Sequence, residues 1–286
     1  LFITKMNLSK KIGFMQGRLS PMENGMIQSF PWNNWQQEFD CANDIGISAM
    51  EWTLDQENLY KNPLMNKEGQ KEIIQLCLEH KITIPSLTGD CFMQFPFWKM
   101  EGKEKAAYQN IFLDIIKNCS IIGIKMVVVP LVDNGRIENK KHEENLISFL
   151  VNHSSLIKKL GMKIIFESDF DPLKLKTFIG KLDRDNFGIN YDTGNSASLG
   201  FNPIDEIKSY GDRIENVHIK DRVLNGTTVP LGDGDTDFNS IFKSLKDIEY
   251  KGNFILQTAR SDNNKQVLKK YFENVKFWLE RYEFKS

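Results

Sequence analysis

The chain has 286 residues, of which 26% are charged, and its formal net charge is −1. A chain of this length can hold one or two domains, and a single α/β barrel commonly reaches it. The near balance of charge disfavours a general nucleic-acid or membrane-surface binder, which would carry a basic excess.

Short apolar runs alternate with longer amphipathic stretches along the chain. The first half is expected to form strands at 11–15, 47–52, 82–87 and 125–130, and helices at 34–45, 68–80, 103–122 and 141–160. Gly46 and Gly123 follow two of these helices, and glycine is common where a helix ends. The fourth strand is an unbroken apolar run, as expected of a strand buried on both faces.

The second half continues the alternation. Strands are expected at 162–167, 187–192, within 213–222 and at 253–257, and helices at 172–179, 203–210, 241–248 and 264–282. Eight strand–helix units with a spacing of roughly 35 residues predict a single (β/α)₈ barrel domain over residues 1–286. An open doubly wound sheet is the alternative, but it lacks the support of a glycine-rich dinucleotide fingerprint.

Three successive strands each end in a possible metal ligand, namely Glu167, Asp192 and His218. The carboxyl ends of barrel strands meet at one mouth, so these side chains are predicted to converge there. The same argument places four more strand-end residues at this mouth: Arg18, Glu51, Asp90 and Gln257. For a carboxylate such as Glu51 or Asp90, the competing interpretation is a helix N-cap.

Charged residues follow His218 within the same stretch, at Lys220, Asp221 and Arg222. A strand does not need these side chains for packing, whereas an ammonium and a guanidinium suit an anionic group on a substrate. The alternative for Lys220 and Arg222 is a pair of solvated charges at the rim of the barrel.

The compartment is predicted to be the cytoplasm. The four cysteines are scattered without a CxxC pair, which favours a reduced chain over a disulfide framework. No apolar run approaches the roughly 20 residues of a membrane helix. Residues 1–7 lack the extended apolar core of a secretory signal.

Four motifs in the second half resemble those of a known family. They are Phe166-Glu-Ser-Asp169, Tyr191-Asp-Thr-Gly-Asn195, Val217-His-Ile-Lys-Asp-Arg222 and Val229-Pro-Leu-Gly-Asp-Gly234. In order and interval they are similar to the sugar-phosphate isomerases and epimerases of the xylose-isomerase-like TIM-barrel superfamily. The resemblance covers essentially the whole barrel.

The resemblance implies a divalent metal in the mouth, with Mn²⁺, Mg²⁺, Co²⁺ or Zn²⁺ all compatible with an oxygen and nitrogen ligand set. Carried over by position, its ligands are Glu167, Asp192, His218 and Gln257. Gln257 stands where the family carries a glutamate, and an amide oxygen can ligate a cation but carries no charge and takes up no proton at neutral pH. Asn195 is a second departure, because many members have a histidine there.

The implied substrate is a small sugar or sugar phosphate, with no nucleic acid or membrane as partner, and a homo-oligomer is left open. Glu167 is the candidate base that removes a proton beside a carbonyl, and it also contacts the metal. The candidate substrate contacts are Lys220, Arg222, Arg260, Arg18 and Asn195.

Several functions remain open from the sequence. A family epimerase uses a pair of carboxylates, so the loss of the one at Gln257 favours an isomerase, or a lyase or dehydratase that uses the same enolate. A non-catalytic sugar-binding barrel is the alternative from another class. A DNA-repair endonuclease of this superfamily is disfavoured, because it needs a histidine-rich site and a basic face.

Overall fold

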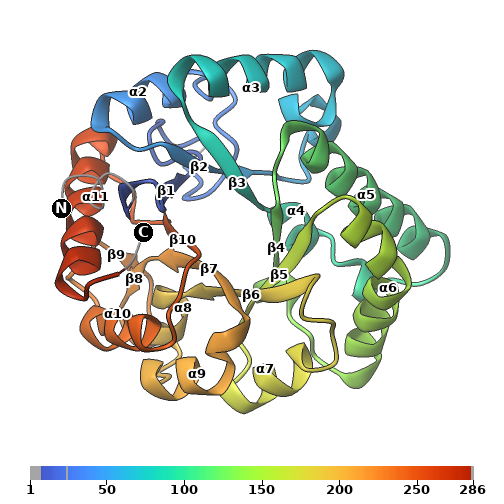
Figure 1. Ribbon diagram of the computed structural model, residues 1–286. Coiled ribbons are helices and arrows are strands. Elements are labelled where there is room, and N and C mark those ends of the chain that lie inside the picture. Colours follow the sequence, from blue (N-terminus) through green and yellow to red (C-terminus); the bar gives the residue numbers. More distant parts are fainter. Residues whose placement is uncertain (1–7, 24, 285–286) are drawn as a thin grey trace.

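The computed structural model describes residues 8–23 and 25–284, and its eight longer strands close into a parallel barrel (Figure 1). The strands follow one another around the barrel in chain order, and the first pairs with the last. They are β1 (Ile12–Met15), β2 (Ala49–Thr53), β3 (Thr83–Thr88), β4 (Met126–Leu131), β5 (Lys163–Ser168), β6 (Phe187–Asp192), β7 (Ile214–Ile219) and β10 (Asn253–Leu256). The predicted barrel is confirmed, and the open doubly wound sheet is wrong because the sheet closes.

Helices form a ring around these strands (Figure 1). They are α2 (Gln37–Ile45), α3 (Lys67–His80), α5 (Gly102–Ile122), α6 (Lys140–Lys159), α7 (Pro172–Ile179), α9 (Pro203–Tyr210), α10 (Phe238–Asp247) and α11 (Asn264–Arg281). Two predicted starts were wrong. Helix α2 begins at Gln37 rather than near Asn34, because the preceding residues form turns. Helix α10 begins at Phe238, one turn earlier than predicted, because Asp237 caps it by accepting a hydrogen bond from the Ser240 N–H.

Short elements that the sequence pattern did not predict surround the mouth. Helix α4 (Asp90–Gln94) follows β3 after one residue, and helix α8 (Thr193–Ser198) directly follows β6. The strand expected within 213–222 is β7, and beyond it Asp221–Arg222 form a separate short strand, β8, that pairs antiparallel with β9 (Thr228–Val229). Five short 3₁₀ helices complete the described elements: Leu59–Lys61, Pro63–Met65, Phe97–Lys99, Asp133–Gly135 and Gly211–Arg213.

A layer of polar side chains lies inside the barrel, where branched apolar residues are usual. Glu51 accepts hydrogen bonds from the Ser86 hydroxyl at 2.6 Å and the Asn216 side-chain amide at 3.1 Å. The Asn216 amide also donates to Asn190 at 2.8 Å. All four side chains are buried. These contacts tie β2, β3, β6 and β7 together below the mouth and give the site above them a fixed polar base.

The structure bears only in part on two predictions about location, the lack of a secretory signal and the lack of a membrane helix. The prediction that the chain start lacks a secretory signal concerns residues 1–7, which lie outside the described residues. Among the described residues, no helix is both long enough and apolar enough to cross a membrane.

Candidate functional site

Three buried side chains from neighbouring strands form a group that could hold a metal ion. Glu167 comes from β5, Asp192 from the end of β6 and His218 from β7. One ligand atom of each lies within 4.8 Å of the others. The register explains the meeting, because Asp192 lies beside His218 in the paired strands β6 and β7. The predicted convergence of these three residues is therefore present in the fold.

The imidazole of His218 is oriented by Glu51, a residue of β2. The His218 Nε2 atom lies 2.7 Å from Glu51 Oε1, and both side chains are fully buried. This contact leaves His218 Nδ1 on the side of Glu167, at 3.2 Å from Glu167 Oε2. Metal-binding histidines commonly donate their other nitrogen to a carboxylate in this way. The sequence placed Glu51 at the mouth, but the structure places it beneath the ligand group.

The protonation of His218 follows from its neighbours. Burial alone would lower the pKa of the imidazole, but the charge of Glu51, followed by the hydrogen bond to Glu167, raises that pKa to about 10. The two neighbouring carboxylates therefore favour the protonated imidazole. Binding a metal at Nδ1 would require the release of a proton.

Asp192 divides its two oxygens between a helix and a lysine. Its Oδ1 accepts from the Asn195 N–H at 2.8 Å and caps α8, and its Oδ2 lies 3.2 Å from Lys220 Nζ. Gly194 lets the lysine stem pass, because a Cβ at this position would lie 2.8 Å from Lys220 Cγ. The Asp-Thr-Gly-Asn turn thus positions a candidate ligand and a cation together.

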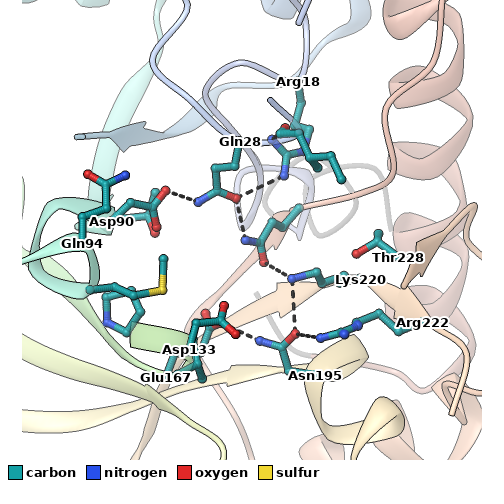
Figure 2. A pocket seen from close by; sticks show the side chains of 16 residues that line it. Arg18, Gln28, Asp90, Gln94, Asp133, Glu167, Asn195, Lys220, Arg222 and Thr228 are labelled. Carbon is teal, nitrogen blue, oxygen red and sulfur yellow. Dashed lines mark hydrogen bonds between the residues drawn. The ribbon is translucent and has the colours of Figure 1, made fainter. Parts of the chain in front are cut away.

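The mouth contains a cavity of about 270 Å³, the size of a small ligand, and Figure 2 shows the side chains that line it. Arg18, Lys220 and Arg222 supply positive charge, and Asp90, Asp133 and Glu167 supply negative charge. Charged groups of both signs fit a small polar ligand that carries an anionic substituent. Burial, followed by the charge of Arg260, lowers the pKa of Arg18 to about 10, so it stays cationic at neutral pH.

Asn195 connects the candidate base to these cations. Its side-chain amide donates to Glu167 Oε1 at 2.6 Å, and its oxygen accepts from Arg222 Nη1 at 2.8 Å and from Lys220 Nζ at 3.3 Å. Figure 2 shows this row of contacts from Arg222 to Glu167. The residue therefore orients the carboxylate relative to the cationic side of the cavity.

Gln257 lies directly after β10 and lines the same cavity. Its Oε1 is 3.4 Å from Lys220 Nζ, and its Nε2 donates to Gln28 Oε1 at 2.9 Å. Gln28 in turn donates to Asp90 at 2.6 Å. Neither the role of Gln28 nor this chain of amides was predicted, because Gln28 lies in a loop without a periodic pattern.

Arg260 is not brought to this cavity. Its guanidinium donates to the Gly17 carbonyl and, at 2.8 Å, to the Ser20 carbonyl, so it anchors the loop after β1. Asp221 also has a supporting place: it is fully buried and accepts from the backbone N–H groups of Gly232, Gly234 and Thr236. These contacts fold the loop after β9 beside the mouth.

The donor set fits a divalent metal. Two carboxylates and an imidazole are ligands that Zn²⁺ and Mn²⁺ accept, and Glu51 fixes the imidazole. The positive charge of Lys220 beside Asp192 repels a metal cation. The negative charges of the two carboxylate ligands and of Glu51 attract the cation and exceed that single positive charge. Glu167, Asp192 and His218 are thus the residues that would hold the ion.

The sequence pattern described as xylose isomerase-like TIM barrel matches residues 39–281, and the chain belongs to this family. The Escherichia coli K12 protein named "Putative L-ribulose-5-phosphate 3-epimerase SgbU" is 22% identical over 261 residues, covering 86% of this chain and 91% of its own. An inosose dehydratase of Clostridium perfringens strain 13 is 29% identical over 282 residues, covering 78% and 92%.

A solved structure with the same fold is that of the IOLI protein with a bound zinc atom. Its TM-score is 0.70 at 17% identity, and the match covers 96% of this chain and 99% of that one. The family thus contains sugar-processing enzymes, both epimerases and dehydratases among them.

Proposed function

We propose that the protein is a divalent-metal-dependent isomerase or epimerase that acts on a sugar or sugar phosphate through an enediolate. The observation that carries this proposal is the double position of Glu167. It belongs to the buried ligand group with Asp192 and His218, and it also lines the cavity that contains Lys220. A candidate base, a candidate metal site and a cation for the substrate therefore share one small space.

The residues of the chain have separate tasks in this proposal. Lys220 and Arg222 bind an anionic group of the substrate and fix its orientation. Glu167, held by Asn195, removes the proton from the carbon beside the carbonyl, and in an isomerisation it returns that proton to the adjacent carbon. The metal, when bound, supplies polarisation of the carbonyl and stabilises negative charge on the substrate oxygens.

A dehydratase is the second candidate, and Gln257 favours it. Gln257, directly after β10, replaces the glutamate whose carboxylate is the second base in the epimerases that the chain resembles. A dehydratase begins with the same proton removal but continues by expelling a hydroxyl group. The relationship to inosose dehydratases supports including this reaction.

Solvent exchange tests the shared first step of these reactions. The protein is stripped of metal, reloaded with Mn²⁺ and incubated in D₂O with L-ribulose 5-phosphate, L-ribulose and inosose. We expect loss of the NMR signal of the proton beside the carbonyl for at least one compound, only with Mn²⁺, and a drop of about 10²- to 10⁴-fold in Glu167→Gln.

The control for this experiment is Glu38→Gln, which removes a buried carboxylate outside the cavity. It should exchange at the wild-type rate. Binding of these compounds without any exchange would contradict the proposal and identify a non-catalytic sugar-binding barrel.

A further inference from the structure

Asp90 is a buried carboxylate in the wall of the cavity that the proposed reaction does not yet use. It follows β3 as the first residue of α4, and only 7% of it is exposed. Among the residues that the structure describes, its side chain accepts one hydrogen bond, from Gln28 Nε2 to Oδ2 at 2.6 Å. A carboxylate can accept about four, so most of its capacity is not used by the protein.

Glu38 shows what a structural carboxylate looks like in the same protein. It is 1% exposed, and its Oε1 accepts from the backbone N–H groups of Gly17 and Leu19, both at 2.9 Å. Glu38 lies on α2 and does not line the cavity. Asp90 is buried to a similar degree, yet it lines the cavity with Glu167. Buried polar groups left with unused capacity at a cavity point to a ligand or to chemistry.

The surroundings give Asp90 a proton affinity suited to acid–base work. Burial, followed by the charge of Asp55, raises its pKa to about 7, and Glu167 adds to this rise. The hydrogen bond from Gln28 and the charge of Arg18 act in the opposite direction. A group with a pKa near 7 is present in both protonation states at neutral pH and can donate or accept a proton there.

The amides between Gln257 and Asp90 explain how the cavity manages without a carboxylate after β10. Gln257 donates to Gln28, and Gln28 donates to Asp90, so both amides are oriented with their N–H groups toward the carboxylate side. Figure 2 shows the contact between Gln28 and Asp90 at the cavity. Neither amide can take up a proton at neutral pH, so their effect is to hold Asp90 in place.

We infer that Asp90 is the second acid–base group of this cavity. It donates a proton to the substrate, whereas Glu167 removes one. The inference rests on the proposed function, since it assigns the second proton transfer of that reaction. It also removes the need for a carboxylate at position 257.

The transfer balances for either reaction. In an epimerisation, Glu167 takes the proton as the C–H bond breaks, and protonated Asp90 delivers its own proton to the other face of the same carbon. Solvent then returns both carboxyl groups to their starting states. In a dehydration, Glu167 takes the proton, the C–O bond breaks, and Asp90 protonates the departing hydroxyl group, so that water leaves as the C=C bond forms.

The test separates proton removal from product formation in Asp90→Asn, using the Mn²⁺-loaded protein and the three compounds named above. Glu167 still removes the proton, so we expect exchange with D₂O within about threefold of wild type, while net conversion falls about 10²-fold or more. Glu167→Gln should lose both. Glu38→Gln, the matched buried carboxylate, should keep both. The pH dependence of conversion in wild type should show a group titrating near 7 that is missing in Asp90→Asn.

The outcomes are distinct. Asp90→Asn that converts substrate as fast as wild type, or that loses exchange and conversion equally, would overturn the inference and leave the proposed function standing. If wild type itself shows no exchange, the proposed function fails and the inference with it. Should Asp90→Asn not fold, as judged by circular dichroism, the same comparison is made in Asp90→Ser.

Discussion

Arg222 offers a direct test of what the cationic side of the cavity binds. Its Nε and Nη2 atoms donate to the Gly226 carbonyl at 3.1 and 2.6 Å, and Nη1 donates to Asn195. Three of its five N–H groups are thus engaged, and the remaining two have no partner among the residues that the structure describes. One of the two belongs to Nη1 and the other to Nη2, and an arginine can bind a phosphate with these two nitrogens as a pair.

The magnitude follows from these two donors. A hydrogen bond to a charged group contributes about 1.5–3 kcal/mol, and about 1.4 kcal/mol corresponds to a tenfold change in affinity. Arg222→Ala should therefore raise KM for L-ribulose 5-phosphate about tenfold or more, with a smaller effect on L-ribulose. Arg222→Lys, which keeps the charge but not the paired geometry, should fall between wild type and Arg222→Ala.

The KM values for L-ribulose 5-phosphate and L-ribulose are measured from the rate of deuterium exchange as a function of substrate concentration. Arg222 also holds Asn195, which positions Glu167, so a change in kcat common to both sugars is expected and is not diagnostic. The ratio of the two KM values is the informative quantity. An equal rise in KM for the phosphorylated and the unphosphorylated sugar would refute the role of Arg222 as a phosphate anchor.

Three further results are expected. In Gln257→Glu, the new carboxylate pairs with Lys220 and also attracts the metal cation. The Mn²⁺ affinity, measured by calorimetry, should therefore rise and become more pH-dependent. An unchanged Mn²⁺ affinity would show that position 257 does not contact the ion. His218→Ala and Asp192→Asn should each lower the Mn²⁺ content after purification, and full occupancy in both would contradict the ligand assignment. Burial raises the pKa of Glu38 to about 7, so the folded state holds this proton more tightly than the unfolded chain, and stability is lost as pH rises from about 4.5 to about 7. Urea unfolding should show that Glu38→Gln removes up to about 3 kcal/mol of this decline, and an identical decline in both proteins would argue against it.

The group of candidate metal ligands could be predicted from the sequence because each member lies at or near the end of a strand. An apolar run followed by Glu167, Asp192 or His218 is a local pattern, and the barrel rule that strand ends converge does the rest. The strands themselves were found because their apolar runs are bounded by turns, and β5 and β6 lie within one residue of the predicted limits.

The contacts that position the site were not accessible in the same way. Glu51 and His218 are 167 residues apart, and their contact depends on closure of the barrel. Helices α4 and α8 have only five and six residues, too few to show a helical repeat. Arg260 lies three residues beyond Gln257, but the chain has turned away from the cavity there, and its guanidinium binds the loop after β1.

We propose that Glu167, Asp192 and His218 hold a divalent metal beside the cavity at the mouth of the barrel. Crystals grown with Mn²⁺ test it directly, because anomalous scattering locates the ion without assumptions about its ligands. We expect one strong peak within bonding distance of a carboxylate oxygen of Glu167, a carboxylate oxygen of Asp192 and Nδ1 of His218, with Glu51 still on Nε2. A cavity without an anomalous peak at saturating Mn²⁺, or a peak bound to other residues, would contradict the claim.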